Sequence, residues 1–174
     1  MILIDTSVWI DYFNGYASLH ADFLTLCIAE SRPIVLAGLV LTETLQGVRD
    51  AQQADITRRV LLAYPLAPEL DRTDYEQAAA IYRACRAHGS TPRSAVDCLI
   101  AQLCLRHGYE LLTCDRDFEA IGKLFPLALI SPAPGVQEQA LVYFTPGPPL
   151  TRRSASAPRR SSPASAAHRR ASRR

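Results

Sequence analysis

Patterns typical of membrane and secreted proteins are absent from this 174-residue sequence. No apolar run reaches the roughly 18 residues that a membrane-spanning helix needs. Asp5 lies inside the first apolar run and no basic segment precedes it, which is not typical of a signal peptide. The five cysteines include no CxxC pair, so neither a disulfide framework nor a structural zinc site is expected. These absences favour a cytoplasmic protein in a reducing compartment, without a membrane partner.

Motifs of several enzyme classes are absent as well. The sequence contains no phosphate-binding GxxxxGKS or GxxxxGKT loop and no GxGxxG segment, which argues against nucleoside triphosphate and dinucleotide chemistry. Its four histidines form no HxH or HExxH pair, and no GxSxG is found, which argues against zinc hydrolases and serine esterases. Chemistry therefore has to be sought among the acidic residues.

Charge is distributed unevenly along the chain. Residues 146–174 contain eight arginines and no acid, so residues 1–145 hold 11 of the 19 Lys and Arg residues against all 17 acids, a net charge of −6. The C-terminal part is rich in Pro, Ser and Arg, a composition that cannot offset the chain entropy lost on folding. We expect a globular domain over residues 1–135 and a disordered tail over residues 136–174. The tail arginines either contact nucleic acid phosphates or form a solvated extension.

Short apolar runs alternate with helical patterns over residues 1–135. The runs predict four strands, at 2–4, 34–37, 110–113 and 127–130. The 3.6-residue apolar spacing predicts helices at 6–13 (with Thr6 or Ser7 as its cap), 17–31, 42–48, 52–63, 72–87, 94–107 and 115–122. Strands separated by helices in this way pair in parallel through right-handed crossovers. We therefore expect an α/β fold of three layers, with a short parallel sheet and helices on both sides.

Five acids are expected to lie near one another, beyond the carboxyl ends of the strands of such a sheet. Asp5 and Asp115 each follow a predicted strand directly, and sites in parallel sheets lie beyond the carboxyl ends of the strands. Asp97 lies in the first turn of the helix leading into the 110–113 strand, Glu43 lies on the helix after the second strand, and Asp117 is two residues beyond Asp115. Structural roles remain open for several of these acids, because Asp5, Asp115 or Asp117 can cap a helix and Asp97 suits a helix N-terminus.

Crowded carboxylates repel one another unless a cation lies between them. Mg²⁺ and Mn²⁺ prefer oxygen ligands, and either ion can polarise a phosphoryl oxygen and activate water for in-line attack. The acids therefore predict metal-assisted hydrolysis of a phosphodiester. Arg93 and Arg116 are the basic residues nearest the acids in sequence, and each either guides a phosphate or pairs with an adjacent carboxylate.

Four segments together resemble the PIN-domain ribonucleases, and especially the VapC-type toxins of bacterial toxin–antitoxin pairs. The resemblance runs from residue 1 to about residue 131 and is carried by ILIDTSVW (2–9), Thr42-Glu43 followed by Gly47, DCLIA (97–101) and LTCDRDF (112–118). It implies a PIN-like fold and a Mg²⁺- or Mn²⁺-dependent endoribonuclease that cleaves cellular RNA such as tRNA or rRNA.

The resemblance also implies site residues and partners. The acidic quartet of the family corresponds to Asp5, Glu43, Asp97 and Asp115, the acid that many members add corresponds to Asp117, and Thr6 or Thr113 is in a position to bond metal-bound water. The expected partners are RNA and a small cognate antitoxin, in a homodimer or a toxin–antitoxin hetero-oligomer. The alternatives are an inactive PIN-like protein-binding module and a DNA-directed metal nuclease. An aspartate-nucleophile phosphatase is disfavoured, because Ser7 replaces the second acid and Lys123 is the only lysine.

Overall fold

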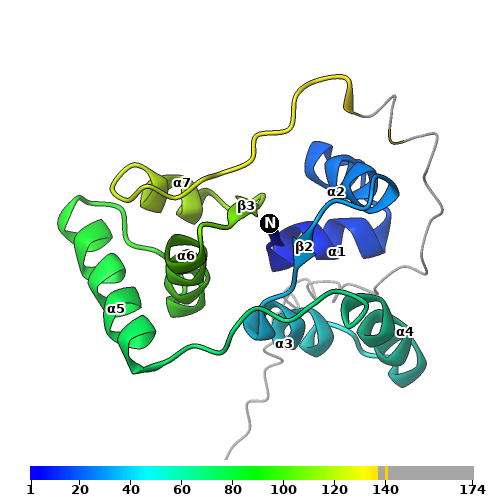
Figure 1. Ribbon diagram of the computed structural model, residues 1–174, viewed down its shortest axis with the longest axis horizontal. Helices are drawn as coiled ribbons and strands as arrows, with labels where there is room; N and C mark the ends of the chain where they lie inside the picture. The colour runs from blue at the N-terminus through cyan, green and yellow to red at the C-terminus, as the bar shows by residue number, and fades with distance from the viewer. Residues whose placement is uncertain (137–139, 141–174) are drawn as a thin grey trace, which may run out of the picture.

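The computed structural model describes residues 1–136 and residue 140, and these form an α/β fold of three layers (Figure 1). The central layer is a parallel sheet in the order β2-β1-β3. Its strands in the described chain are β1 (Ile2–Ile4), β2 (Ile34–Val35) and β3 (Glu110–Leu112). In register, Leu3 lies opposite Val35 on one side and Leu111 on the other.

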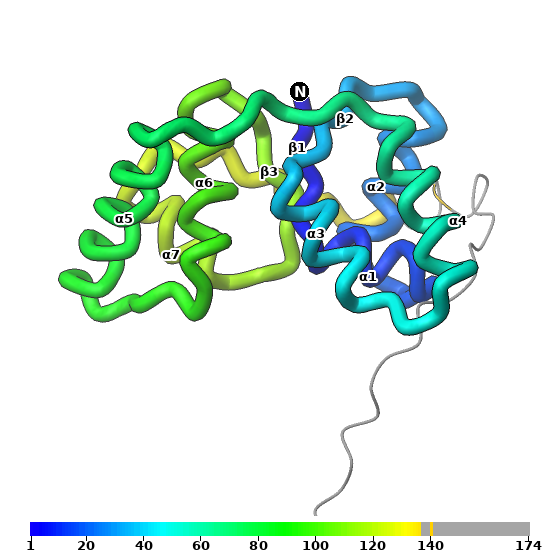
Figure 2. The backbone as a smooth tube through the Cα atoms, turned by 90° about the horizontal axis from the view of Figure 1, so that it is seen from below, coloured from blue at the N-terminus to red at the C-terminus, as the bar shows by residue number. Residues whose placement is uncertain are grey.

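Helices cover both faces of this sheet, as predicted. The first group is α1 (Thr6–Asn14), α2 (Leu19–Ala29), α3 (Gly38–Gln46) and α4 (Ala51–Leu61). The second group is α5 (Arg72–Ala87), α6 (Ala95–His107) and α7 (Arg116–Gly122). Figure 2 shows the strands between the two groups. Helix α1 packs against α2 and α3, while α6 packs against α5 and α7.

Burial on both faces explains why the strands are continuous apolar runs. Leu3 and Ile4 are fully buried, as expected for a parallel sheet covered by helices on both sides. Trp9 of α1 is also fully buried and stacks on Phe13, with 5.6 Å between ring centroids. The core therefore holds β1 and α1 in place, and with them Asp5, the residue that joins these two elements.

The predicted fourth strand at 127–130 was wrong. In this segment Leu129 forms a single parallel bridge with Leu111, held by hydrogen bonds from Leu111 N to Ala128 O (2.8 Å) and from Ile130 N to Leu111 O (2.9 Å). Prolines at 126 and 132 flank the segment and cannot donate to a ladder, so pairing stops after one residue pair.

Helix α3 begins four residues before the predicted start at Thr42. Leu41 N donates to Ala37 O (3.0 Å), and the Thr42 hydroxyl donates back to Gly38 O (3.0 Å), so Thr42 lies inside the helix. The expected disorder of residues 136–174 falls, apart from Val136 and Ala140, outside the described residues and stays a prediction. Among the described helices, none has the length and apolar character needed to cross a bilayer.

Candidate active site

Asp5 lies where β1 ends and α1 begins. Its carboxylate caps α1 by accepting a hydrogen bond from Ser7 N (3.2 Å), and it also accepts from Ser7 Oγ (2.5 Å) and Thr113 Oγ1 (3.0 Å). All three bonds end on Oδ2, so Ser7 and Thr113 leave Oδ1 uncommitted. Only 5% of the residue is exposed, and burial raises its pKa despite the hydrogen bonds. Asp5, and not the predicted Thr6 or Ser7, is the cap of α1.

Asp97 is the second acid of the cluster, and the Ser94 backbone donates a hydrogen bond to its carboxylate. It lies in the first turn of α6, whose cap is Ser94. Among the described residues, no side chain donates a hydrogen bond to it. Burial raises the pKa of Asp97 to about 7, and negative neighbours add to the effect. Those neighbours are Asp115, Asp5 and Asp117, in order of effect, so the structure brings four of the five predicted acids within electrostatic reach of one another.

Glu43 is linked to the site by a hydrogen bond from the hydroxyl group of Thr6. It lies on α3, and its Oε2 accepts a hydrogen bond from Thr6 Oγ1 (2.7 Å) at the start of α1. Thr6 directly follows Asp5 in the chain, so this bond holds Glu43 against the same end of α1. Of the five acids, Glu43 is the one that the structure links to the others indirectly, across Thr6.

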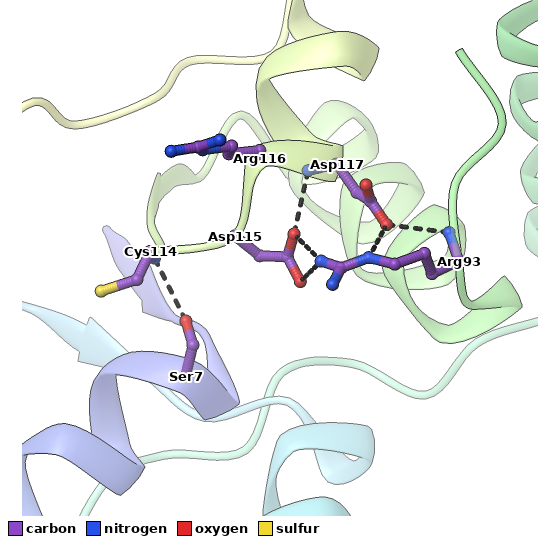
Figure 3. Close-up of a pocket in the computed structure, with 6 residues that line it drawn as sticks. All are labelled: Ser7, Arg93, Cys114, Asp115, Arg116 and Asp117. Atoms are coloured by element: carbon purple, nitrogen blue, oxygen red, sulfur yellow. Dashed lines mark hydrogen bonds and ion pairs between the residues drawn. The ribbon is translucent and has the colours of Figure 1, made fainter.

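Asp115 and Asp117 lie at the start of α7, where they share one arginine (Figure 3). Asp115 is the cap of α7 and accepts from Asp117 N (2.9 Å). Arg93 Nη2 donates to both oxygens of Asp115 (2.5 and 2.6 Å), while Arg93 Nε and N donate to Asp117 Oδ2 (3.0 and 2.8 Å). Arg93 therefore pairs with carboxylates, one of the two roles predicted for it, but its partners are Asp115 and Asp117 and not Asp97, the acid nearest to it in sequence. Arg116 is exposed and points away from both acids.

Ser7 is the contributor that the sequence patterns missed. Besides donating to Asp5, its Oγ accepts a hydrogen bond from Cys114 N (3.1 Å), which ties α1 to the segment after β3. Thr113 makes a similar link, since its hydroxyl donates to Asp5 and accepts from Asp115 N (3.0 Å). A hydroxyl two residues after an acidic helix cap is a sequence signal for the Ser7 contact, whereas the long-range bonds carry no local signal.

A pocket of about 430 Å³ opens beside the acids. Its lining consists of Ser7, Arg93, Cys114, Asp115, Arg116 and Asp117. Two guanidinium groups and a hydroxyl thus face a space next to the carboxylates. That combination suits a negatively charged, hydrogen-bonding group such as a phosphate.

The donor atoms of the cluster suit a hard divalent cation. Within the described part of the chain, no three Asp, Glu, His or Cys side chains are gathered closely enough to form a complete metal site alone. Oδ1 of Asp5 accepts no bond from Ser7 or Thr113, and the Asp97 carboxylate accepts a bond from the Ser94 backbone but none from a described side chain; the charges of the two acids repel. Mg²⁺ commonly keeps several waters and takes only one or two carboxylates directly. Two direct carboxylates, with the other acids acting through water, fit that preference.

Known proteins with a similar sequence and known proteins with a similar fold come from the same group. The sequence profile of the PIN domain matches residues 2–124. Ribonuclease VapC11 of Mycobacterium tuberculosis is 37% identical over 132 residues, which cover 75% of this chain and 98% of that protein. Among solved structures, VapBC2 from Rickettsia felis, bound to a DNA fragment from its promoter, has a TM-score of 0.60 at 19% identity, covering 75% of this chain and 98% of that one. VapC20 of Mycobacterium tuberculosis, a toxin that cleaves the sarcin-ricin loop, has a TM-score of 0.56 at 22% identity, covering 70% and 95%.

Proposed function

The chain belongs to the PIN-domain family and, within it, to the VapC ribonucleases, and we propose that it is the ribonuclease toxin of a toxin–antitoxin pair, hydrolysing cellular RNA in the cytoplasm with a divalent cation. The observation that carries this proposal is that Asp5 and Asp97, two acids from separate elements, lie within electrostatic reach of each other, one buried and the other with its pKa raised to about 7. Acids whose charged form is disfavoured in this way are expected where a cation binds.

Asp5 and Asp97 are the residues that would hold Mg²⁺ or Mn²⁺ most directly, with Glu43, Asp115 and Asp117 completing the shell through water. When bound, such an ion polarises a phosphoryl oxygen and makes water a better nucleophile. The protein supplies the orientation. Ser7 and Thr113 hold Asp5 through Oδ2, so that Oδ1 would be available to the cation.

The remaining polar groups position the RNA and the outer acids. Thr6 fixes the Glu43 carboxylate by a 2.7 Å hydrogen bond, so that Glu43 can accept a proton or a hydrogen bond from a water at the site. Arg116 lines the pocket beside the acids and is free to approach a phosphate of the incoming RNA. This matters because residues 1–145 carry a net charge of −6, which opposes the approach of a polyanion.

An antitoxin with an exposed basic side chain is the partner that fits this site. The structural relative VapBC2 is itself a complex, and the neighbouring carboxylates of Asp5 and Asp97 attract an arginine or lysine from a bound protein. We propose that the cognate antitoxin inhibits this chain by placing such a side chain against the acids. The complete assembly is a toxin–antitoxin hetero-oligomer.

Cleavage of a labelled RNA by purified protein tests the nuclease proposal. Wild type with Mn²⁺ should cleave, whereas EDTA or the Asp5→Asn variant should reduce the rate at least about a hundredfold, since the cation provides both nucleophile and charge stabilisation. Glu119→Gln, which removes an exposed acid of α7 outside the cluster, is the matched control and should retain wild-type activity. Cleavage that persists in EDTA or in Asp5→Asn contradicts the metal mechanism.

Expression in a bacterial host tests the toxin proposal separately. The chain alone should arrest growth, and coexpression of the neighbouring small reading frame should relieve the arrest. A purified protein that cleaves RNA with Mn²⁺, is harmless at high expression and binds no small partner would refute the toxin proposal and leave the nuclease proposal standing.

A further inference from the structure

Arg93 makes three side-chain hydrogen bonds to two acids of the site. Nε donates to Asp117 Oδ2, and Nη2 donates to both oxygens of Asp115. A guanidinium has five N–H donors, so the two on Nη1 remain, and in the described chain no hydrogen bond occupies them. Figure 3 shows the guanidinium lying between the two carboxylates at the edge of the pocket.

Main-chain contact fixes this arginine in place. Arg93 N donates to Asp117 Oδ2 (2.8 Å), the same oxygen that accepts from Nε (3.0 Å), so both ends of the residue are anchored to α7. Its side chain is 73% exposed, against 27% for Asp115 and 17% for Asp117. Ion pairs this exposed contribute little to folding stability. The main effect of the contact is therefore on the charge and ligand capacity of the site.

The contact occupies the oxygens that a second cation would need. Nη2 bridges the two oxygens of Asp115, and Oδ1 accepts a further bond from Asp117 N, so the chelating edge of this carboxylate is filled. In two-ion nucleases the ions lie about 4 Å apart and share carboxylates. Here the cation that faces Asp115 and Asp117 is the guanidinium group of Arg93.

We propose that Arg93 takes the place of a second metal ion: it neutralises Asp115 and Asp117 and presents its Nη1 donors to a phosphate oxygen of the RNA, so that the site works with one divalent ion held at Asp5 and Asp97. This inference rests on the proposed metal-dependent nuclease function. Arginine suits the role because its planar fork can bind carboxylates on one side and a phosphate on the other, which a lysine ammonium cannot do with the same geometry.

Counting bound Mn²⁺ tests the first half of the proposal. Electron paramagnetic resonance of the full chain, titrated with Mn²⁺, should give one ion per chain for wild type and two for Arg93→Gln, in which Asp115 and Asp117 are released. Arg116→Gln is the matched control, because it removes the same charge from the same pocket without breaking a bond to either acid, and it should still bind one ion. Thermal unfolding of each variant in EDTA checks that the fold is intact.

The outcomes separate this inference from the nuclease proposal. Two ions in wild type, one ion in Arg93→Gln, or two ions in both arginine variants would overturn the replacement of a metal by Arg93, while leaving metal dependence intact. No Mn²⁺ bound by wild type would instead refute the proposed metal site itself.

Binding of single-stranded RNA in EDTA tests the phosphate contact. If Nη1 binds a phosphate, Arg93→Gln should reduce the slope of log affinity against log salt by about 0.7, the value for one phosphate of a single strand. An unchanged salt slope in Arg93→Gln would overturn the phosphate role.

Discussion

Replacing Asp97 by Asn should make the protein more stable in the absence of metal and less stable than wild type in its presence. Asn has nearly the same shape as Asp but no charge. In wild type the Asp97 carboxylate is partly buried beside Asp115, Asp5 and Asp117, and no described side chain donates a hydrogen bond to it. The substitution therefore removes the repulsion between these carboxylates and, with it, one proposed ligand of the metal ion.

The size of the gain follows from the pKa. Raising the pKa of Asp97 from 3.8 to about 7 would correspond to about 4 kcal/mol of lost stability above pH 7 for a fully buried group. Asp97 is only partly buried, so solvent screening reduces this, and we expect Asp97→Asn to gain about 1 to 2 kcal/mol at pH 8. Because the folded pKa lies above the unfolded one, wild type binds an extra proton on folding between about pH 4 and 7 and loses stability as the pH rises through that window. The gain should accordingly be small at pH 4.5 and level off above pH 7.

Urea denaturation followed by circular dichroism measures both effects. In EDTA the variant should unfold at higher urea than wild type at pH 8, with the difference shrinking at pH 4.5. Added Mn²⁺ at a hundred times its dissociation constant should stabilise wild type by about 2.7 kcal/mol, because only the folded state offers the site, and should leave the variant unchanged. The order of stability of the two proteins therefore reverses on adding Mn²⁺.

Two results would refute this reasoning. A variant that is less stable than wild type in EDTA would show that Asp97 is compensated by contacts other than a metal. A gain of equal size at pH 4.5 and pH 8 would show that charge repulsion is not its cause. Glu119→Gln serves as the control for a general change in net charge, and it should show neither the gain nor the loss of the Mn²⁺ effect.

Two further predictions concern the fold and the tail. Asp74→Asn should lower the free energy of unfolding by about 2 kcal/mol at pH 7, since Asp74 is 1% exposed and accepts bonds from Asp71, Gln102 and Arg106. Burial acts to raise the pKa of Asp74, but these hydrogen bonds outweigh burial and lower it. Their contribution to stability is therefore present above about pH 4 and is lost as the pH falls through the folded pKa. Urea denaturation should show a smaller stability difference between wild type and Asp74→Asn at pH 3 than at pH 7. Truncation after residue 140 should leave the melting temperature nearly unchanged while weakening RNA binding and its salt dependence, measured by fluorescence anisotropy, because the eight tail arginines are lost. A large fall in melting temperature would show that the tail packs on the domain.

Sequence reasoning located the acids because strand ends can be recognised locally. Asp5 and Asp115 follow short apolar runs, and in a parallel sheet such positions share one edge, so their proximity follows from topology alone. The segment around Leu129 was predicted as a strand, but it forms only one bridge. The strand propensity and burial of a segment do not reveal how many of its residues pair with a neighbouring strand. That number depends on how the segment lies beside β3 in the folded chain.

Side-chain partners could not be predicted in the same way. Arg93 lies four residues before Asp97 in sequence, yet it bonds to acids 22 and 24 residues away. The choice depends on the direction in which the loop before α6 presents the guanidinium, which no periodicity encodes. The Ser7 contact with Cys114 spans 107 residues and is equally invisible to spacing rules.

Two of the acids also hold helices in place, and this decides how an inactive form of the protein should be made. Asp5 and Asp115 are the N-caps of α1 and α7, whereas the N-cap of α6 is Ser94 and not Asp97. Asn caps a helix about as well as Asp, but Ala loses about 1 kcal/mol at such a position. An alanine at Asp5 or Asp115 thus weakens a helix and removes an acid of the proposed site at once, so a loss of activity would have two causes. Asparagine at either position removes the charge alone, and a folded, inert toxin suitable for capturing bound RNA or antitoxin is best obtained with it.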